Sequence, residues 1–153
     1  MIKLLVIYFA IAINITFAQH LDQYRIKSVN TGTFLQAPGA RGESLTLGDA
    51  WGKWTIDPAP QPGIATVSTI YDSAADLYAG LEDPITPGSK ITAVSESYNF
   101  QIAELSPGNY VIYPPDQDFY WFSNASIKPS IEVEHASGVS GNAIYFNFEP
   151  ALE

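Results

Sequence analysis

Apolar and aromatic residues recur along this chain at two nearly equal spacings. Two triplets repeat every 46 residues: Trp54, Phe100 and Phe146, then Ile56, Ile102 and Phe148. Three more repeat every 43 residues: Tyr24, Val67 and Tyr110; Phe34, Leu77 and Tyr120; Leu35, Tyr78 and Trp121. A period in the forties is typical of units that bury their apolar faces against one another. The sequence therefore predicts three similar structural units.

The segments between turn signals are short and typical of β-strands. Eleven prolines and eleven glycines separate alternating or apolar stretches such as YRIKSV, FQIAEL and YVIYP. Strand-like stretches at such short intervals indicate an all-β protein. Four strands in each of three units are too few for a long solenoid, so we expect a closed barrel with pseudo-threefold symmetry. Closure leaves no exposed sheet edge.

The N-terminal segment has the pattern of a secretory signal peptide. Lys3 supplies the positive start, residues 4–13 are an unbroken apolar run, and Thr16 and Ala18 are the small residues before a cut at Gln19. An apolar run of about ten residues is too short to cross a bilayer. We predict a signal peptide over residues 1–18 and one secreted, extracellular domain over 19–153.

We expect the mature protein to begin at or near Gln19 and to accumulate in the medium. The physical reason is the small-residue cleavage site that follows the apolar run. Intact-mass analysis of secreted material checks this. Secreted protein that still carries residues 1–18 would contradict the prediction.

Charge and composition exclude several classes of partner and site. The formal net charge is −9, from 16 acidic and 7 basic residues. Such a surface repels phosphate backbones and anionic lipids, so we expect neither a nucleic-acid nor a membrane partner. The chain has no cysteine and therefore no disulfide, thiol nucleophile or thiolate metal site. We expect a monomer without cofactor or metal.

Two stretches carry a resemblance to known families. YRIKSVNTGTFLQAPG…WGKW resembles the opening repeat of ricin-B-like β-trefoils, in which a strand, an Asn-Ser/Thr-Gly turn, a second strand and a closing tryptophan recur. YVIYPP…IEVEHASGVSGNAIYFNFEP is similar to the end of small fungal β-trefoil protease inhibitors of the cospin and mycocypin types. The resemblance covers residues 21–150 and implies the β-trefoil fold. It implies two alternative functions, peptidase inhibition and carbohydrate binding.

The inhibitor resemblance implies that an inter-strand loop contacts the peptidase. QAPGARGESL, residues 36–45, joins two strands of the first unit and holds Arg41, one of two arginines in the chain. A long cation among small residues suits a trypsin-like pocket, whose buried carboxylate pairs with guanidinium. We expect an inhibitor of serine endopeptidases rather than an enzyme, although mycocypin-like inhibition of cysteine peptidases and a merely solvated arginine stay open. The predicted contact residues are Pro38, Gly39, Ala40, Arg41, Gly42 and Glu43.

Lys90 and Lys128 are predicted to lie in comparable loops of the other two units and are weaker candidates for the same contact. A third alternative is a structural or toxin-like secreted protein without a small-molecule site.

The ricin-B-like resemblance implies a sugar site, but its usual residues are missing. That site needs an aspartate directly after the second-strand leucine, whereas the three corresponding residues here are Gln36, Ala79 and Phe122. The closing strands also lack the expected glutamine. A nonstandard sugar site could instead use three residues of PPDQDFY, which otherwise form a turn and a core strand: Asp116, Asp118 and Tyr120.

The remaining polar motifs favour structural roles. Alternation in IEVEH places Glu132 and Glu134 on one side of a strand and His135 on the other, so a solvated strand is expected rather than a metal site. Asp116 and Asp118 are expected to form a turn rather than a catalytic pair. Asn124 opens an N-glycosylation sequon, Asn-Ala-Ser, and is the expected glycosylation site if it is exposed.

Overall fold

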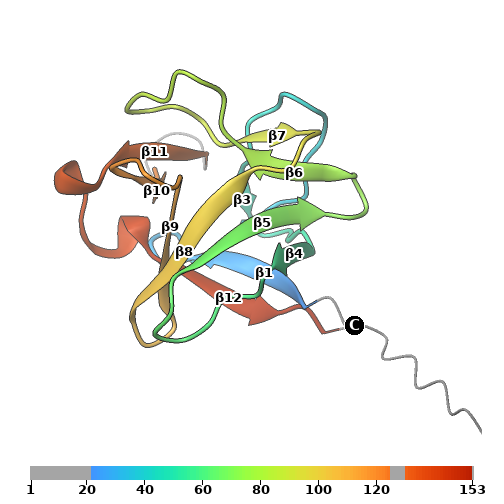
Figure 1. The fold of residues 1–153 in the computed structure, drawn as a ribbon. Coiled ribbons are helices and arrows are strands. Elements are labelled where there is room, and N and C mark those ends of the chain that lie inside the picture. The colour runs from blue at the N-terminus through green and yellow to red at the C-terminus, as the bar shows by residue number, and fades with distance from the viewer. Residues whose placement is uncertain (1–21, 125–129, 153) are drawn as a thin grey trace, which may run out of the picture.

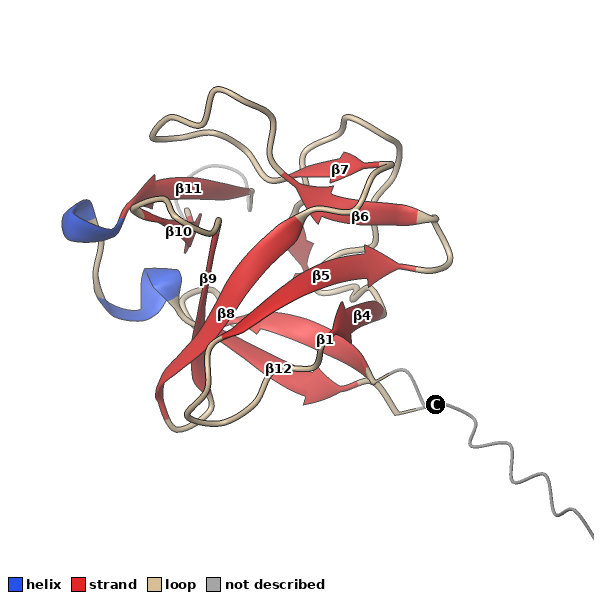
Figure 2. Cartoon of the chain, in the orientation of Figure 1, coloured by secondary structure: helices blue, strands red, loops and turns tan. Residues whose placement is uncertain are grey.

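The computed structural model describes residues 22–124 and 130–152, and nearly all of their regular structure is strand (Figure 2). Six strands form a barrel: β1 (Gln23–Ser28), β4 (Trp54–Asp57), β5 (Thr66–Asp72), β8 (Asn99–Ser106), β9 (Asn109–Tyr113) and β12 (Phe146–Pro150). Six more form three hairpins: β2 (Phe34–Leu35) with β3 (Leu47–Gly48), β6 (Leu77–Gly80) with β7 (Thr92–Val94), and β10 (Phe119–Ser123) with β11 (Ile131–His135). Two 3-10 helices, Ala136–Gly138 and Gly141–Ile144, precede β12. The predicted signal peptide lies outside the described residues.

The barrel closes on itself through antiparallel pairing. Going around it, β1 pairs with β12, β12 with β9, β9 with β8, β8 with β5, β5 with β4, and β4 with β1. The three hairpins gather at one end of this barrel (Figure 1). Closure satisfies the backbone groups that an open sheet would leave at its edges. The predicted all-β architecture with three four-strand units is confirmed.

Three backbone hydrogen bonds around the hairpins reveal the pseudo-threefold axis. The Leu45 N–H donates to the Ile91 carbonyl at 2.8 Å, and the Ile91 N–H donates to the Ile131 carbonyl at 3.0 Å. The Ile131 N–H completes the circle by donating to the Leu45 carbonyl at 3.5 Å. These residues are 0–2% exposed, so the ring is part of the core. Each unit therefore binds the next through a corresponding residue, which lies just before β3 or β7 or at the first position of β11.

The closing-strand aromatics occupy equivalent core positions, as the spacing of 46 predicts. Trp54, Phe100 and Phe146 are all 0% exposed. The Phe100 and Phe146 rings both meet Trp121 edge-on, with centroid distances of 5.1 and 5.9 Å. The Trp54 indole N–H donates to the Leu35 carbonyl at 3.3 Å, which satisfies its polar group inside the core.

The 43-residue alignment of the opening strands is wrong by one residue in the second unit. Val67 is 50% exposed and cannot be the counterpart of a core residue. Two triplets that are 0% exposed give the correct register: Ile26, Ile70 and Ile112; Leu35, Ala79 and Trp121. The spacings are 44 and then 42 residues. Their mean is 43, so a constant spacing of 43 matches the first and third units but misses the second by one residue. Side chains alternate along a strand, so an error of one residue exchanges the core side for the outer side.

Candidate functional site

Three rows of residues each cross four neighbouring strands on the side away from the core. Three strands of each row belong to one unit, and the first strand belongs to the preceding unit. Strand pairing defines the first two rows, which we call face 1 and face 2. In the third row, face 3, a ring contact joins the β8–β9 pair to the β10–β11 pair. Face 1 comprises Asn147, Lys27, Phe34 and Gly48. Face 2 comprises Thr55, Tyr71, Tyr78 and Val94. Face 3 comprises Gln101, Tyr113, Tyr120 and Glu134.

Face 3 combines two aromatic rings with two polar side chains. The Tyr113 and Tyr120 rings meet edge-on, with centroids 5.6 Å apart and planes inclined by 72°. Gln101 lies opposite Tyr113 across the β8–β9 pairing, and Glu134 lies opposite Tyr120 across the β10–β11 pairing. All four side chains are half-buried, so each presents a surface that is held in place by its neighbours.

The chemistry of face 3 suits a ligand with both an apolar side and hydroxyl groups. Burial, with a smaller effect of the neighbouring Tyr120, raises the pKa of the Tyr113 phenol, so this phenol stays neutral. A neutral phenol can donate as well as accept a hydrogen bond, whereas the Glu134 carboxylate accepts only. Within the part of the chain that the structure describes, neither tyrosine hydroxyl on face 3 forms a hydrogen bond. These groups can therefore serve a ligand.

The predicted sugar residues Asp116 and Asp118 lie in the turn that joins β9 to β10. Both are exposed, and Asp116 adopts a φ of 60°, in the left-handed region that aspartate tolerates better than most residues. The Asp118 carbonyl accepts a hydrogen bond from the Ala136 N–H at 3.2 Å, which ties the turn to the end of β11. The turn thus borders face 3, and Tyr120 is the predicted residue that lies on it.

The predicted peptidase-contact loop ends in a closed, braced turn. The Glu43 N–H donates to the Ala40 carbonyl at 3.2 Å, and the Ala40 N–H donates to the Glu43 carboxylate at 3.1 Å. Gly42 has a φ of 85°, which glycine adopts without strain. The Gly42 N–H also donates to the Ala93 carbonyl of β7 at 2.8 Å. The turn presents Arg41 as an exposed side chain and fixes the backbone beneath it.

This geometry limits how the loop could contact a peptidase. Extended peptides bind along a partner by continuing its strand pairing. The residues around Arg41 fold back on themselves, so they cannot pair with a peptidase as an extended strand. Arg41 can instead enter the peptidase as one side chain, next to the preceding loop residues Pro38 and Gly39. The assignment of residues 38–43 to a peptidase contact stays a prediction.

The second unit repeats this turn, but not with a lysine at the tip. The Ser89 N–H donates to the Thr86 carbonyl at 3.0 Å, and the Gly88 N–H donates to the Val133 carbonyl at 2.8 Å. Pro87 therefore corresponds to Arg41. Lys90 forms an ion pair with Glu132 instead. Lys90 does lie in the comparable loop, between β6 and β7, but not at its tip, and its ion pair crosses the contact between two units. Lys128 lies outside the described residues.

The prediction that IEVEH forms a solvated strand is wrong at Glu132. Glu132 is only 9% exposed, and its carboxylate accepts hydrogen bonds from Lys90 and, at 3.4 Å, from the Asn124 amide. His135 is exposed and stacks on Phe119, with centroids 4.7 Å apart. Asn124 is half-buried, and its use as a glycosylation site stays a prediction. Across residues 22–124 and 130–152, no three metal-ligating side chains gather closely enough to hold an ion.

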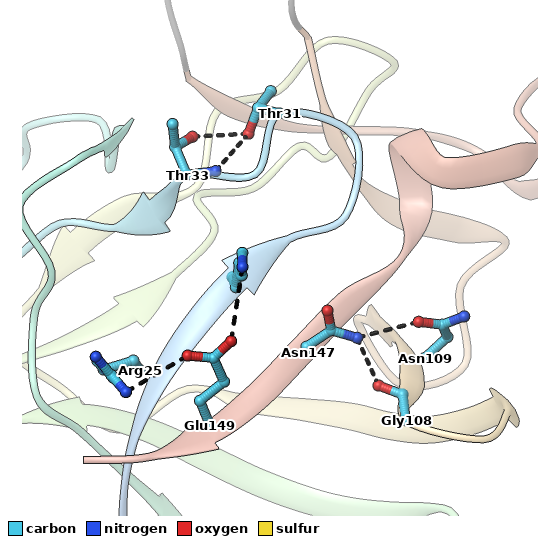
Figure 3. A network of polar contacts seen from close by, with 8 residues as sticks. Arg25, Thr31, Thr33, Gly108, Asn109, Asn147 and Glu149 are labelled. Carbon is cyan, nitrogen blue, oxygen red and sulfur yellow. Dashed lines mark hydrogen bonds and ion pairs between the residues drawn. The ribbon is translucent and has the colours of Figure 1, made fainter. Parts of the chain in front are cut away.

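A cluster of charged and aromatic side chains next to face 1 was not predicted. The Arg25 guanidinium lies 5.1 Å from the Trp51 ring centroid and 5.6 Å from that of Phe34. Glu149 pairs with Arg25 at 3.5 Å and with Lys27 at 3.8 Å across the first and last strands (Figure 3). The sequence signal was the alternation in YRIKSV, which places both cations on one side of a strand. Because Arg25 and Lys27 lie on β1 and Glu149 on β12, these ion pairs link the strands at which the barrel closes.

Comparisons with known proteins agree with this architecture. No protein-family model and no curated protein sequence matches the chain. Among solved structures, a ricin B-like lectin from Macrolepiota procera, in complex with lactose, has a TM-score of 0.68 at 16% identity over 85% of this chain and 96% of its own. The Rhizoctonia solani agglutinin has a TM-score of 0.68 at 17% identity, over 85% and 95%. The designed threefold-symmetric protein ThreeFoil has 0.64 at 14%, over 83% and 97%.

These likenesses and the closed six-strand barrel show that the chain has the β-trefoil fold of ricin B-like proteins. The similarity to protease inhibitors stays an expectation from the sequence. Among the residues that the structure describes, no helix is long and apolar enough to span a membrane.

Proposed function

We propose that this protein binds carbohydrate, and that face 3 holds a neutral sugar. The observation that carries the proposal is the edge-on pair Tyr113–Tyr120, flanked by an amide and a carboxylate on a closed barrel. Aromatic rings receive the apolar side of a pyranose, and a few placed polar groups orient its hydroxyls. The lactose complex of the Macrolepiota procera lectin supports the proposal, because that protein shares the fold.

The ricin-type position does not offer the same chemistry. In the corrected register, the residues after the buried second-strand position are Gln36, Gly80 and Phe122, and none is an aspartate. The Gln36 side-chain oxygen accepts a hydrogen bond from Thr46 at 2.9 Å and is thereby occupied. A sugar site on this chain therefore has to use other residues, as face 3 does.

The charge of the chain favours a neutral ligand. Glu134 lies on face 3, Asp116 and Asp118 border it, and the whole chain has a net charge of −9. A sulfated or uronic-acid sugar would be repelled, whereas neutral hydroxyl groups can donate to the carboxylates.

A glycan array tests the proposal. The secreted protein should bind neutral glycans and leave their sulfated or sialylated versions unbound. The proposed function would be contradicted if the protein bound no neutral glycan at the highest concentration at which it stays in solution.

A second candidate function, peptidase inhibition, is favoured by the braced turn beneath Arg41. The hydrogen bonds from Ala40 to the Glu43 carboxylate and from Gly42 to Ala93 fix the backbone in advance. A contact that is fixed before binding loses less conformational entropy on association. The target would be a secreted or digestive trypsin-like endopeptidase.

If the protein inhibits trypsin, Arg41→Ala should weaken inhibition by at least ~30-fold. A guanidinium that pairs with a carboxylate in a desolvated pocket commonly carries about 2 kcal/mol or more of an interface. Inhibition constants for the wild type, Arg41→Ala and Arg41→Lys measure this, with the lysine variant expected to retain most of the effect. Equal inhibition by wild type and Arg41→Ala, or no inhibition of any serine peptidase by the wild type, would refute this role.

A further inference from the structure

Two of the three units share a short motif that the 43-residue alignment conceals. The segments YDSAADLY, residues 71–78, and YPPDQDFY, residues 113–120, have tyrosine at the first and eighth positions and aspartate at the sixth. The aspartates are Asp76 and Asp118. The corresponding segment of the first unit, KSVNTGTF, has lysine, glycine and phenylalanine at these positions.

The structure places the two tyrosine pairs at corresponding positions of their units. Tyr71 and Tyr78 are opposed across the β5–β6 hairpin, with ring centroids 4.7 Å apart and planes inclined by 39°. They are half-buried, like the tyrosines of face 3. The Tyr71 hydroxyl donates to the Asp76 carboxylate at 2.8 Å, and this hydrogen bond is the main reason why the pKa of Tyr71 is raised. Face 2 therefore combines a fixed pair of rings with an exposed carboxylate.

The neighbours of the two tyrosine pairs differ in polarity. Face 2 has Val94 where face 3 has Glu134, and the buried Thr55 where face 3 has Gln101. Fewer hydroxyl-binding groups make face 2 the weaker of the two for a sugar. Face 1 has Lys27 over the Phe34 ring, 5.5 Å from its centroid, in place of a tyrosine pair.

We propose that face 2 is a second binding site for neutral sugar, so that one molecule is bivalent. This inference rests on the proposed function of face 3. The pseudo-threefold axis relates the two faces by a rotation of a third of a turn. They therefore point in different directions and cannot bind one small oligosaccharide together. They can instead join two glycan chains, and simultaneous engagement on a dense surface raises the apparent affinity without any new contact.

The test uses asialofetuin, a glycoprotein with neutral complex N-glycans, as the probe. Wild type, Tyr78→Ala, Asp76→Asn and Tyr120→Ala are compared in aggregation of asialofetuin-coated beads and in binding to sparse and dense asialofetuin surfaces. Asp76→Asn is included because asparagine tolerates the φ of 55° at this exposed turn position, so folding should be kept. Trp51→Ala, an exposed aromatic outside both tyrosine pairs, is the matched control, and gel filtration of each protein excludes cross-linking by dimers.

We expect the wild type and Trp51→Ala to aggregate the beads. Tyr78→Ala and Tyr120→Ala should lose aggregation and at least ~10-fold of the apparent affinity for the dense surface, while they keep measurable binding to the sparse one. Asp76→Asn should weaken aggregation in the same direction.

Two results would overturn bivalency but leave the proposed function intact: aggregation by folded Tyr78→Ala and Asp76→Asn that equals the wild type, or complete loss of sparse-surface binding in Tyr120→Ala. A wild type that binds neither surface nor any neutral glycan would overturn both.

Discussion

Replacing Phe100 with alanine should destabilise the protein by about 3–5 kcal/mol. The side chain is 0% exposed and packs on the Tyr98 and Trp121 rings, at centroid distances of 4.7 and 5.1 Å. Alanine would leave a cavity at the centre of the pseudo-threefold core, where Trp54 and Phe146 hold the equivalent positions. Urea denaturation followed by tryptophan fluorescence measures the change in the free energy of unfolding.

Val67→Ala is the control, because the 43-residue spacing predicts that Val67 is the core counterpart of Tyr24 and Tyr110. Its side chain is 50% exposed, so the substitution should change the free energy of unfolding by no more than about 0.5 kcal/mol. A nearly neutral Phe100→Ala would contradict the threefold core. A cost of several kcal/mol for Val67→Ala would show that the corrected register is wrong.

The double variant Tyr113→Ala/Tyr120→Ala should weaken the binding of a neutral glycan to face 3, the stronger of the two proposed sites, by at least ~100-fold. Each ring is expected to act as a central aromatic contact worth about 1.5 kcal/mol or more, and about 2.8 kcal/mol corresponds to a hundredfold change in affinity. Titration calorimetry or surface binding with the strongest neutral glycan of the array measures the loss.

Two companion variants separate the rings from their hydroxyls and from unspecific effects. Tyr113→Phe/Tyr120→Phe keeps both rings and should lose only part of the affinity. Trp51→Ala removes an aromatic side chain that is 39% exposed but lies outside face 3, and should bind as the wild type does. If the double alanine variant kept its fold by circular dichroism and its affinity were unchanged, the assignment of the sugar site to face 3 would be wrong.

The fold was accessible from the sequence because the closing strands keep a constant spacing. Trp54, Phe100 and Phe146 are 46 residues apart and all are buried, so a single period finds them. The opening strands are harder, since the spacing is 44 residues between the first two units and 42 between the last two. Only burial in the folded barrel shows that Ser68 and Ala79, and not Val67 and Tyr78, hold the core positions.

The candidate sites depended on contacts across strands, which the sequence could not supply. Tyr120 was predicted, but its neighbours were not: Glu134 lies opposite it through the pairing of β10 with β11, and Tyr113 meets it through a contact between β9 and β10. Small flanking residues indicated the exposure of Arg41, whereas the brace from Glu43 to Ala40 required the structure. The ion pair of the loop residue Lys90 could not be predicted, because its partner Glu132 is 42 residues away in the sequence.

The most direct test of sugar binding at face 3 is an NMR titration of protein with carbon-13-labelled tyrosine rings. The strongest neutral glycan of the array is added, and each ring signal is assigned by single Tyr→Phe substitution. The signals of Tyr113 and Tyr120 should shift with the largest amplitudes and saturate along the binding curve. Saturating shifts confined to other tyrosines, with Tyr113 and Tyr120 unmoved at full occupancy, would contradict the account.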